Sequence, residues 1–211
     1  MIRVHHLNNS RSQRVLWLLE ELELPYEIIP YTRDRKTMLA PPELRKIHPL
    51  GKSPVIQDGN VTLAETGVVV DYLVERYGAG RLAPARGTED YWRYAYWLHY
   101  AEGSLMPPLL LKLVLGKMGI LGLPAQGFVN AQIKLHFDYI EGELSAAPWF
   151  AGREFSAADI MMSFPLEAGA SRGGATDGRP RIADFLQRIH ARPAYQRALE
   201  RGGKYAYASK T

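Results

Sequence analysis

The chain has 211 residues, 46% hydrophobic and 23% charged, which suits one large globular domain or two small ones. Its net charge is +4, and no run of Lys and Arg is long enough to indicate nucleic-acid binding. The absence of cysteine excludes disulfides, cysteine-rich zinc sites and thiol nucleophiles. The first ten residues contain no long apolar stretch and no apolar run reaches ~18 residues, so we expect no secretory signal and a cytoplasmic protein that does not enter membranes.

The first 80 residues alternate between predicted strands and helices. The predicted elements are a strand at 2–7, a helix through 15–22, a strand at 26–31, a short helix near 43–47, a hairpin at 54–63 and a helix at 65–77. The first helix repeats apolar residues at i, i+3, i+4 and i+7, and Asp58-Gly59 is a typical hairpin turn. Pro30 indicates an edge strand. This order is the thioredoxin-like pattern.

Residues 78–87 are rich in Gly, Pro and Arg and indicate a domain boundary, after which the sequence is helical in character. The predicted helices of this second part are 89–105, 109–115, 128–144, 156–167 and 182–199. Pro107-Pro108 is expected to interrupt the pattern, and 116–127 is expected to be a loop. The predicted fold is therefore an α/β thioredoxin-like domain at 1–80 followed by an all-α helical-bundle domain at 88–211.

Ser10 stands between the first strand and the first helix. Ser10 to Gln13 match the S-x-x-Q capping box, in which the serine hydroxyl accepts from the backbone of the third helical residue. The same hydroxyl can also donate a hydrogen bond. At a helix N-terminus it would donate toward an anion that the helix dipole also favours, such as a thiolate.

The stretch from His5 to Ile28 resembles the start of a bacterial or fungal glutathione S-transferase of the cytosolic serine-type branch. The catalytic serine of that branch lies four residues before an arginine, a spacing that Ser10 and Arg14 reproduce. The resemblance implies that Ser10 holds the glutathione thiolate. Asn9 and Ser12 lie on the same turn and remain alternatives for that contact, and Asn9 is also expected among the residues that bind glutathione.

Two later motifs extend the resemblance. In the family, the proline of a Lys52-Ser53-Pro54 motif is cis, so that the backbone of Ser53 pairs with the cysteinyl part of glutathione while Lys52 pairs with its glycyl carboxylate. Glu65-Thr66 resembles the pair that opens the family's third helix; Thr66 would hold the γ-glutamyl carboxylate and Glu65 the ammonium group. The stretch 36–42 offers no equivalent of the second basic residue that some members use.

The resemblance implies an enzyme that transfers glutathione to small hydrophobic electrophiles, with peroxidase activity as a second possibility. Glutathione is then a co-substrate, no cofactor or metal is bound, and the protein is a homodimer. Tyr100, Met106 and Pro107 are expected near the electrophile. The alternative is a non-catalytic ligand-binding or regulatory protein of the same fold.

Ser156 to Asp159 form a second predicted capping box, with Phe155 and Ile160 as a hydrophobic staple. We interpret Asp159 as a folding residue rather than a catalyst. The histidines His5, His6 and His99 lack the spacing of a metal site.

Overall fold

The computed structural model describes residues 1–208, in two compact units that are each described by themselves. The first unit comprises Met1–Leu82 and the C-terminal segment from His190, and the second comprises Ala83–Ile189. The elements of the first unit are β1 (Ile2–Leu7), α1 (Ser12–Glu21), β2 (Tyr26–Tyr31), η1 (Pro42–Lys46), β3 (Val55–Asp58), β4 (Val61–Ala64), α2 (Thr66–Tyr77) and α8 (Pro193–Gly202). Those of the second are α3 (Glu89–Tyr100), η2 (Ala101–Leu105), α4 (Met106–Lys117), η3 (Gly119–Gly122), α5 (Leu123–Ala146), α6 (Ala157–Gly173) and α7 (Pro180–His190).

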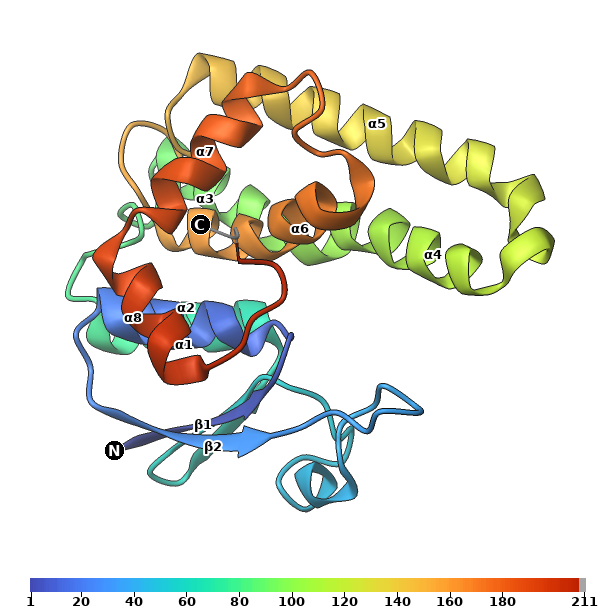
Figure 1. The fold of residues 1–211 in the computed structure, drawn as a ribbon. Helices are drawn as coiled ribbons and strands as arrows, with labels where there is room; N and C mark the ends of the chain where they lie inside the picture. The colour runs from blue at the N-terminus through green and yellow to red at the C-terminus, as the bar shows by residue number, and fades with distance from the viewer. Residues whose placement is uncertain (209–211) are drawn as a thin grey trace. The chain divides into compact units, whose positions relative to one another are not determined.

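The first unit contains a four-stranded mixed sheet in the order β2-β1-β3-β4. β1 pairs with β2 in parallel and with β3 antiparallel, and β3 and β4 form the predicted hairpin. Pro30 lies in the edge strand β2, as predicted. α1, α2 and α8 lie on one face of this sheet (Figure 1), where apolar side chains such as Val4, Leu16 and Val69 are fully buried. The thioredoxin-like prediction is confirmed.

The single helix predicted at 182–199 is wrong, because the chain forms α7 and α8 there. Between them, Arg192 is extended at φ −69° and ψ 129°, and Pro193 is the first residue of α8. A proline disfavours helical geometry at the residue before it but suits the first turn of a new helix. α8 packs against α1, so the C-terminal segment joins the first unit, whereas the sequence assigned 88–211 to one domain.

The second unit is helical, as predicted, and its core is rich in aromatic side chains, including Tyr94, Trp97, Phe137 and Phe150. Two local predictions are wrong. Pro107 does not break the chain's helical course, because a wide π-helical turn, η2, precedes α4 and places the prolines in the first turn of α4. The loop predicted at 116–127 is short, since α5 begins at Leu123 with Pro124 in its first turn.

α6 begins with the predicted capping box. Asp159 Oδ2 accepts 2.8 Å and 3.2 Å hydrogen bonds from the backbone N–H and the hydroxyl of Ser156, and Asp159 Oδ1 accepts one of 2.9 Å from the backbone N–H of Phe150. The Asp159 side chain is completely buried, which supports its assignment as a folding residue. None of the helices within residues 1–208 has the length and apolar character needed to cross a membrane.

Candidate active site

The sheet register brings three loops to one end of the strands, the sheet edge at which β1 ends. His5 of β1 pairs with Val55 of β3, and Val55 pairs with Ala64 of β4. Because β3 is antiparallel to both neighbours, the chain leaves β1, enters β3 and leaves β4 at the same edge. The predicted catalytic turn follows Leu7, the Lys52-Ser53-Pro54 motif precedes Val55, and Glu65-Thr66 follows Ala64. The topology therefore places all three predicted motifs at this edge.

The capping box predicted at Ser10 is wrong. α1 begins only at Ser12, and Ser10 Oγ accepts a hydrogen bond of 3.2 Å from the Ser12 backbone N–H. The Gln13 backbone N–H donates instead to the Ser10 carbonyl, also at 3.2 Å. Within residues 1–208 no group hydrogen-bonds to the buried carboxamide of the Gln13 side chain. A serine that accepts from the N–H two residues ahead closes a tight turn. Ser10 therefore shapes the turn before the helix and is 4% exposed.

Arg33 and Ala206 hold this turn in place. Asn9, just before Ser10, has φ 51°, in the left-handed region that Asn tolerates better than most residues. Its carbonyl accepts from Arg33 Nη2 at 3.3 Å, and its Oδ1 accepts from the Ala206 N–H at 2.7 Å. Arg33 Nε also donates to the Asn8 carbonyl at 3.1 Å. Sequence reasoning missed both residues; the position of Arg33 soon after the parallel strand β2 was its one available signal.

Ser53 lies beside Ser10. Its Oγ donates to the carbonyl of His5 at 2.8 Å and is 3.5 Å from Ser10 Oγ. The Ser53–Pro54 peptide bond is cis, so that prediction is confirmed. Pro54 is buried, whereas the Lys52 side chain is exposed to solvent. The structure thus brings Ser10 and Ser53 together and leaves a cation in the adjoining loop.

Glu65 and Thr66 form the entrance to α2. Glu65 has φ 66° and ψ 115°, its side chain makes no capping hydrogen bond, and its carbonyl accepts from the Val69 N–H at 2.9 Å. Positive φ at a non-glycine residue costs roughly 1–3 kcal/mol and is common at ligand sites. Thr66 is 4% exposed and is the first residue of the helix. The first N–H groups of a helix lack intrahelical partners and favour an anion.

Ser12 and His6 lie behind Ser10. Ser12 Oγ is 2.7 Å from Ser10 Oγ and 2.8 Å from His6 Nδ1. The other ring nitrogen of His6 is 3.1 Å from the Gly202 carbonyl oxygen. Burial lowers the pKa of His6, and the hydrogen bond with Gly202 opposes that shift only in part. From the sequence we infer only that His6 is not part of a metal site. Its hydrogen-bonded connection to Ser10 through Ser12 could not be predicted from the sequence.

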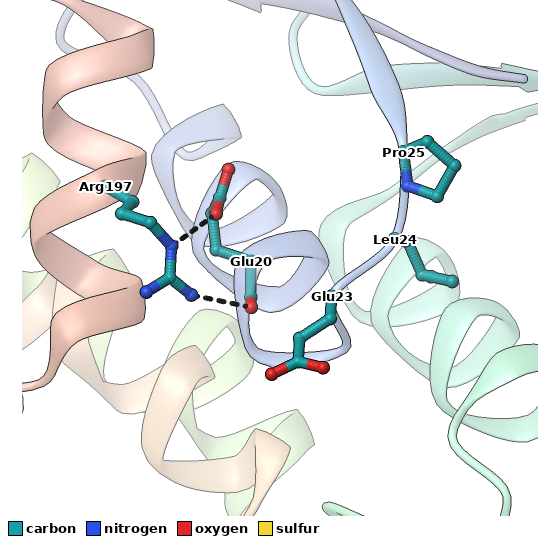
Figure 2. Close-up of a pocket in the computed structure, with 5 residues that line it drawn as sticks. All are labelled: Glu20, Glu23, Leu24, Pro25 and Arg197. Carbon is teal, nitrogen blue, oxygen red and sulfur yellow. Dashed lines mark hydrogen bonds and ion pairs between the residues drawn. The ribbon is translucent and has the colours of Figure 1, made fainter.

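A surface pocket lies near the opposite end of α1, lined by Glu20, Glu23, Leu24, Pro25 and Arg197 (Figure 2). Arg197 donates to the Glu20 carboxylate at 2.8 Å and to its carbonyl at 3.2 Å, so this acid is already paired. A helix rises ~1.5 Å per residue, which puts Glu20 roughly 12 Å along the axis from Ser12. The pocket is therefore distinct from the sheet edge with Ser10.

No metal centre is evident in the described part of the chain, since residues 1–208 contain no group of three or more His, Asp or Glu side chains placed to hold an ion. What the edge offers is a set of hydroxyls, backbone N–H groups, one exposed cation and one exposed acid. This set suits a peptide-like ligand with carboxylates, an ammonium group and an ionisable thiol.

Comparison with known proteins decides the family. A model of the glutathione S-transferase N-terminal domain matches residues 10–76, and one of the C-terminal domain matches residues 128–193. Glutathione S-transferase 1 of Saccharomyces cerevisiae is 35% identical over 223 aligned residues, covering 95% of each chain. The chain belongs to the glutathione S-transferase family. Because its homologues are glutathione S-transferases, the chain is a transferase.

Solved structures of glutathione S-transferases agree with this assignment. The crystal structure of one from Actinobacillus pleuropneumoniae has a TM-score of 0.89 and 38% identity, covering 100% of this chain and 97% of that one. A sphingomonad glutathione S-transferase, solved in complex with glutathione, has a TM-score of 0.80 at 23% identity and covers 95% and 98%. The second likeness concerns the fold alone.

The residues predicted near the electrophile of this glutathione S-transferase surround the π-helical turn of the second unit. Tyr100 and Met106 are buried there, and Pro107 is exposed. Tyr100 Oη is 2.5 Å from His136 Nδ1. Burial raises the pKa of Tyr100 and lowers that of His136, so a neutral phenol and a neutral imidazole share this hydrogen bond at neutral pH. The Tyr100 hydroxyl is therefore engaged within its own unit.

Proposed function

We propose that this protein binds glutathione, stabilises its thiolate with Ser10 and adds the sulfur to small hydrophobic electrophiles, as a serine-type member of its family. One observation carries the proposal: Ser10 is buried at the sheet edge to which the register also brings Ser53 and Thr66. A hydroxyl can donate to a thiolate, and a thiolate is the nucleophilic form of a thiol.

The remaining residues of the edge would hold the peptide. Lys52 pairs with the glycyl carboxylate, and the backbone of Ser53 next to Pro54 pairs with the cysteinyl unit as an added strand. Thr66 and the first N–H groups of α2 hold the γ-glutamyl carboxylate, and Glu65 takes the ammonium group. Each charged group of glutathione thereby has a partner of opposite charge or a hydrogen-bond donor. Asn9 contributes by shaping the turn, whose backbone it fixes.

The proposed reaction of the thiolate with an electrophile requires no bound cofactor. The thiolate sulfur forms a bond to the electrophilic carbon, and the electron pair of the broken bond leaves with the displaced group. The protein's part is to hold the sulfur in its ionised form and to orient it. Tyr100, Met106 and Pro107 remain our proposed contacts for the electrophile.

We also propose a homodimer, as the family resemblance implies. Large apolar side chains are exposed on the helical unit, among them Trp92 at 68%, Phe128 at 68% and Leu135 at 61%. Exposed apolar surface of this kind commonly marks a protein–protein contact. Light scattering coupled to gel filtration tests the proposal: a mass near twice 23.8 kDa supports it, and a monomer at micromolar concentration contradicts it.

Calorimetry with glutathione and a panel of electrophiles (an activated aryl halide, an epoxide and a peroxide) test the activity. We expect glutathione to bind and at least one panel member to react. Peroxide reduction without conjugation would assign a peroxidase. Binding of glutathione without any reaction would favour a non-catalytic ligand-binding protein, and absence of both would contradict the proposal.

A further inference from the structure

A continuous chain of hydrogen bonds runs from Ser10 into the interior of the first unit. Ser10 Oγ and Ser12 Oγ are 2.7 Å apart, Ser12 Oγ and His6 Nδ1 are 2.8 Å apart, and His6 Nε2 is 3.1 Å from the Gly202 carbonyl oxygen. The three side chains are almost inaccessible to solvent, with 4%, 0% and 6% exposure for Ser10, Ser12 and His6.

The direction of every donor in this chain follows from its last member. A carbonyl oxygen only accepts, so His6 Nε2 carries the hydrogen that bonds to Gly202. In a neutral imidazole the other nitrogen, Nδ1, is then an acceptor, and the Ser12 hydroxyl donates to it at 2.8 Å in preference to the Leu7 carbonyl at 3.3 Å. Ser12 Oγ is left as an acceptor for the hydroxyl of Ser10. Ser10 can also donate to Ser53 Oγ at 3.5 Å, but its 2.7 Å contact with Ser12 Oγ is the shorter and stronger one. Along this path each hydrogen then points away from the edge and toward His6.

This direction matters for the thiol. While its hydrogen is directed at Ser12, Ser10 presents a lone pair toward the edge, which suits an S–H donor rather than a thiolate. Reversal of the chain would turn every hydrogen toward the sulfur, and only protonation of His6 Nδ1 lets Ser12 accept there and donate to Ser10. The arrangement therefore couples the state of His6 to the bond that Ser10 can offer.

We propose that Ser10, Ser12 and His6 form a proton relay that takes the thiol proton of glutathione. The thiol hydrogen passes to Ser10 Oγ, the Ser10 hydrogen to Ser12 Oγ, and the Ser12 hydrogen to His6 Nδ1. The products are a thiolate that accepts a hydrogen bond from Ser10 and an imidazolium at His6, so atoms and charge balance. This inference rests on the proposed function; Ser12 and His6 act through Ser10 and are positioning residues.

Burial explains why the relay needs glutathione. His6 is neutral in its buried setting, because burial lowers its pKa. A thiolate at the other end of the chain adds a negative charge that favours the imidazolium, and charges attract more strongly in a poorly solvated interior than in water. Ser12 Oγ also lies 3.3 Å from both the backbone nitrogen and the carbonyl oxygen of Leu7. If Ser12 served only to make these structural contacts, His6 would stay neutral when glutathione binds.

The test observes His6 directly. In protein carrying ¹⁵N-labelled histidine, with the His6 signals assigned from His6→Gln, the ring nitrogens are compared without ligand, with glutathione and with S-methylglutathione. We expect neutral His6 with Nε2–H in the free protein and with S-methylglutathione, and a doubly protonated ring with glutathione. The ultraviolet absorbance of the bound thiolate is recorded on the same samples.

Matched variants separate the relay from the structural tie. Ser12→Ala should lose both the imidazolium signal and the thiolate absorbance at neutral pH, and Ser12→Thr, which keeps the hydroxyl, should restore both. If Ser12→Ala does not fold, the wild-type comparison still decides. A thiolate formed while His6 stays neutral overturns the relay and leaves the proposed function standing. Failure of glutathione to bind in calorimetry overturns both.

Discussion

Asn9 Oδ1 accepts a 2.7 Å hydrogen bond from the backbone N–H of Ala206, 197 positions further along the chain. The same segment supplies the Gly202 carbonyl that bonds to His6. The end of the first unit thus fastens the turn that carries Ser10, and a residue predicted to touch glutathione also has an architectural role.

Asn9 offers a test of that role. Asn9→Gly removes the acceptor for Ala206 but relieves the backbone at φ 51°, whereas Asn9→Ala removes the acceptor and adds strain. We expect a loss in the free energy of unfolding of about 1 kcal/mol for Gly and about 2–3 kcal/mol for Ala. Denaturant titration measures both, and equal losses would show that the strained backbone plays no part.

Arg33 should be required for glutathione affinity because it holds the turn before Ser10, although we do not expect it to contact glutathione. Its guanidinium donates to the carbonyls of Asn8, Asn9 and Met38, a fork that lysine cannot reproduce. We expect Arg33→Lys to weaken glutathione binding about tenfold, roughly 1.4 kcal/mol. The exposed Arg35 provides the control, since Arg35→Lys should bind normally. Calorimetry that finds the two variants alike would contradict the role of Arg33.

Glu20 should fasten α8 to α1. Its carboxylate accepts from Arg197 at 2.8 Å, from Arg201 at 2.9 Å and from Tyr26 at 2.7 Å. Glu20→Gln should lower the free energy of unfolding by about 2 kcal/mol at neutral pH. The control is Glu23→Gln, because Glu23 lines the same pocket but is exposed (Figure 2). Denaturant titrations that give equal losses would contradict this prediction.

The pH dependence of the Glu20 contribution has a defined sign. Burial opposes ionisation of Glu20, but the hydrogen bonds from Arg197, Tyr26 and Arg201 outweigh it and lower its pKa. The contribution is therefore fully present above the unfolded pKa and is lost as pH falls through the lower folded pKa. Glu20→Gln should have a shallower acid limb in its stability profile than the wild type.

Asp159 should show the opposite dependence. Burial raises the pKa of Asp159 to about 7, above the ordinary aspartate value of 3.8. The folded protein then holds this proton between about pH 4 and 7 where the unfolded chain has lost it, so stability falls as pH rises across that window and levels above it. Asp159→Asn, which cannot ionise, should remove this slope in denaturant titrations at several pH values. An unchanged slope in Asp159→Asn would show that other titrating groups cause it.

The strand pattern of the first unit could be predicted from local signals. Asp58-Gly59 marks the hairpin, Pro30 marks an edge strand, and the capping box before Asp159 depends on neighbours only three residues apart. The places of the three motifs at one edge follow from the predicted topology. Their roles in holding glutathione came from the family resemblance and remain proposals.

What could not be predicted depends on distant contacts or on a choice between local hydrogen bonds. The contacts of Ala206 with Asn9 and of Gly202 with His6 depend on where α8 ends in three dimensions. The capping box at Ser10 failed because the Ser12 N–H, one residue nearer than Gln13, takes the serine oxygen. The single helix predicted at 182–199 failed because Pro193 begins a new helix.

The proposed function depends above all on whether Ser10 holds the glutathione thiolate. The most direct measurement is the ultraviolet absorbance of bound thiolate at neutral pH in the wild type and in Ser10→Ala, with saturation of both by glutathione confirmed in calorimetry. We expect a clear thiolate band in the wild type and its loss in Ser10→Ala. A band of unchanged intensity in Ser10→Ala would contradict the claim and move the role to Asn9, Ser12 or the backbone of the turn.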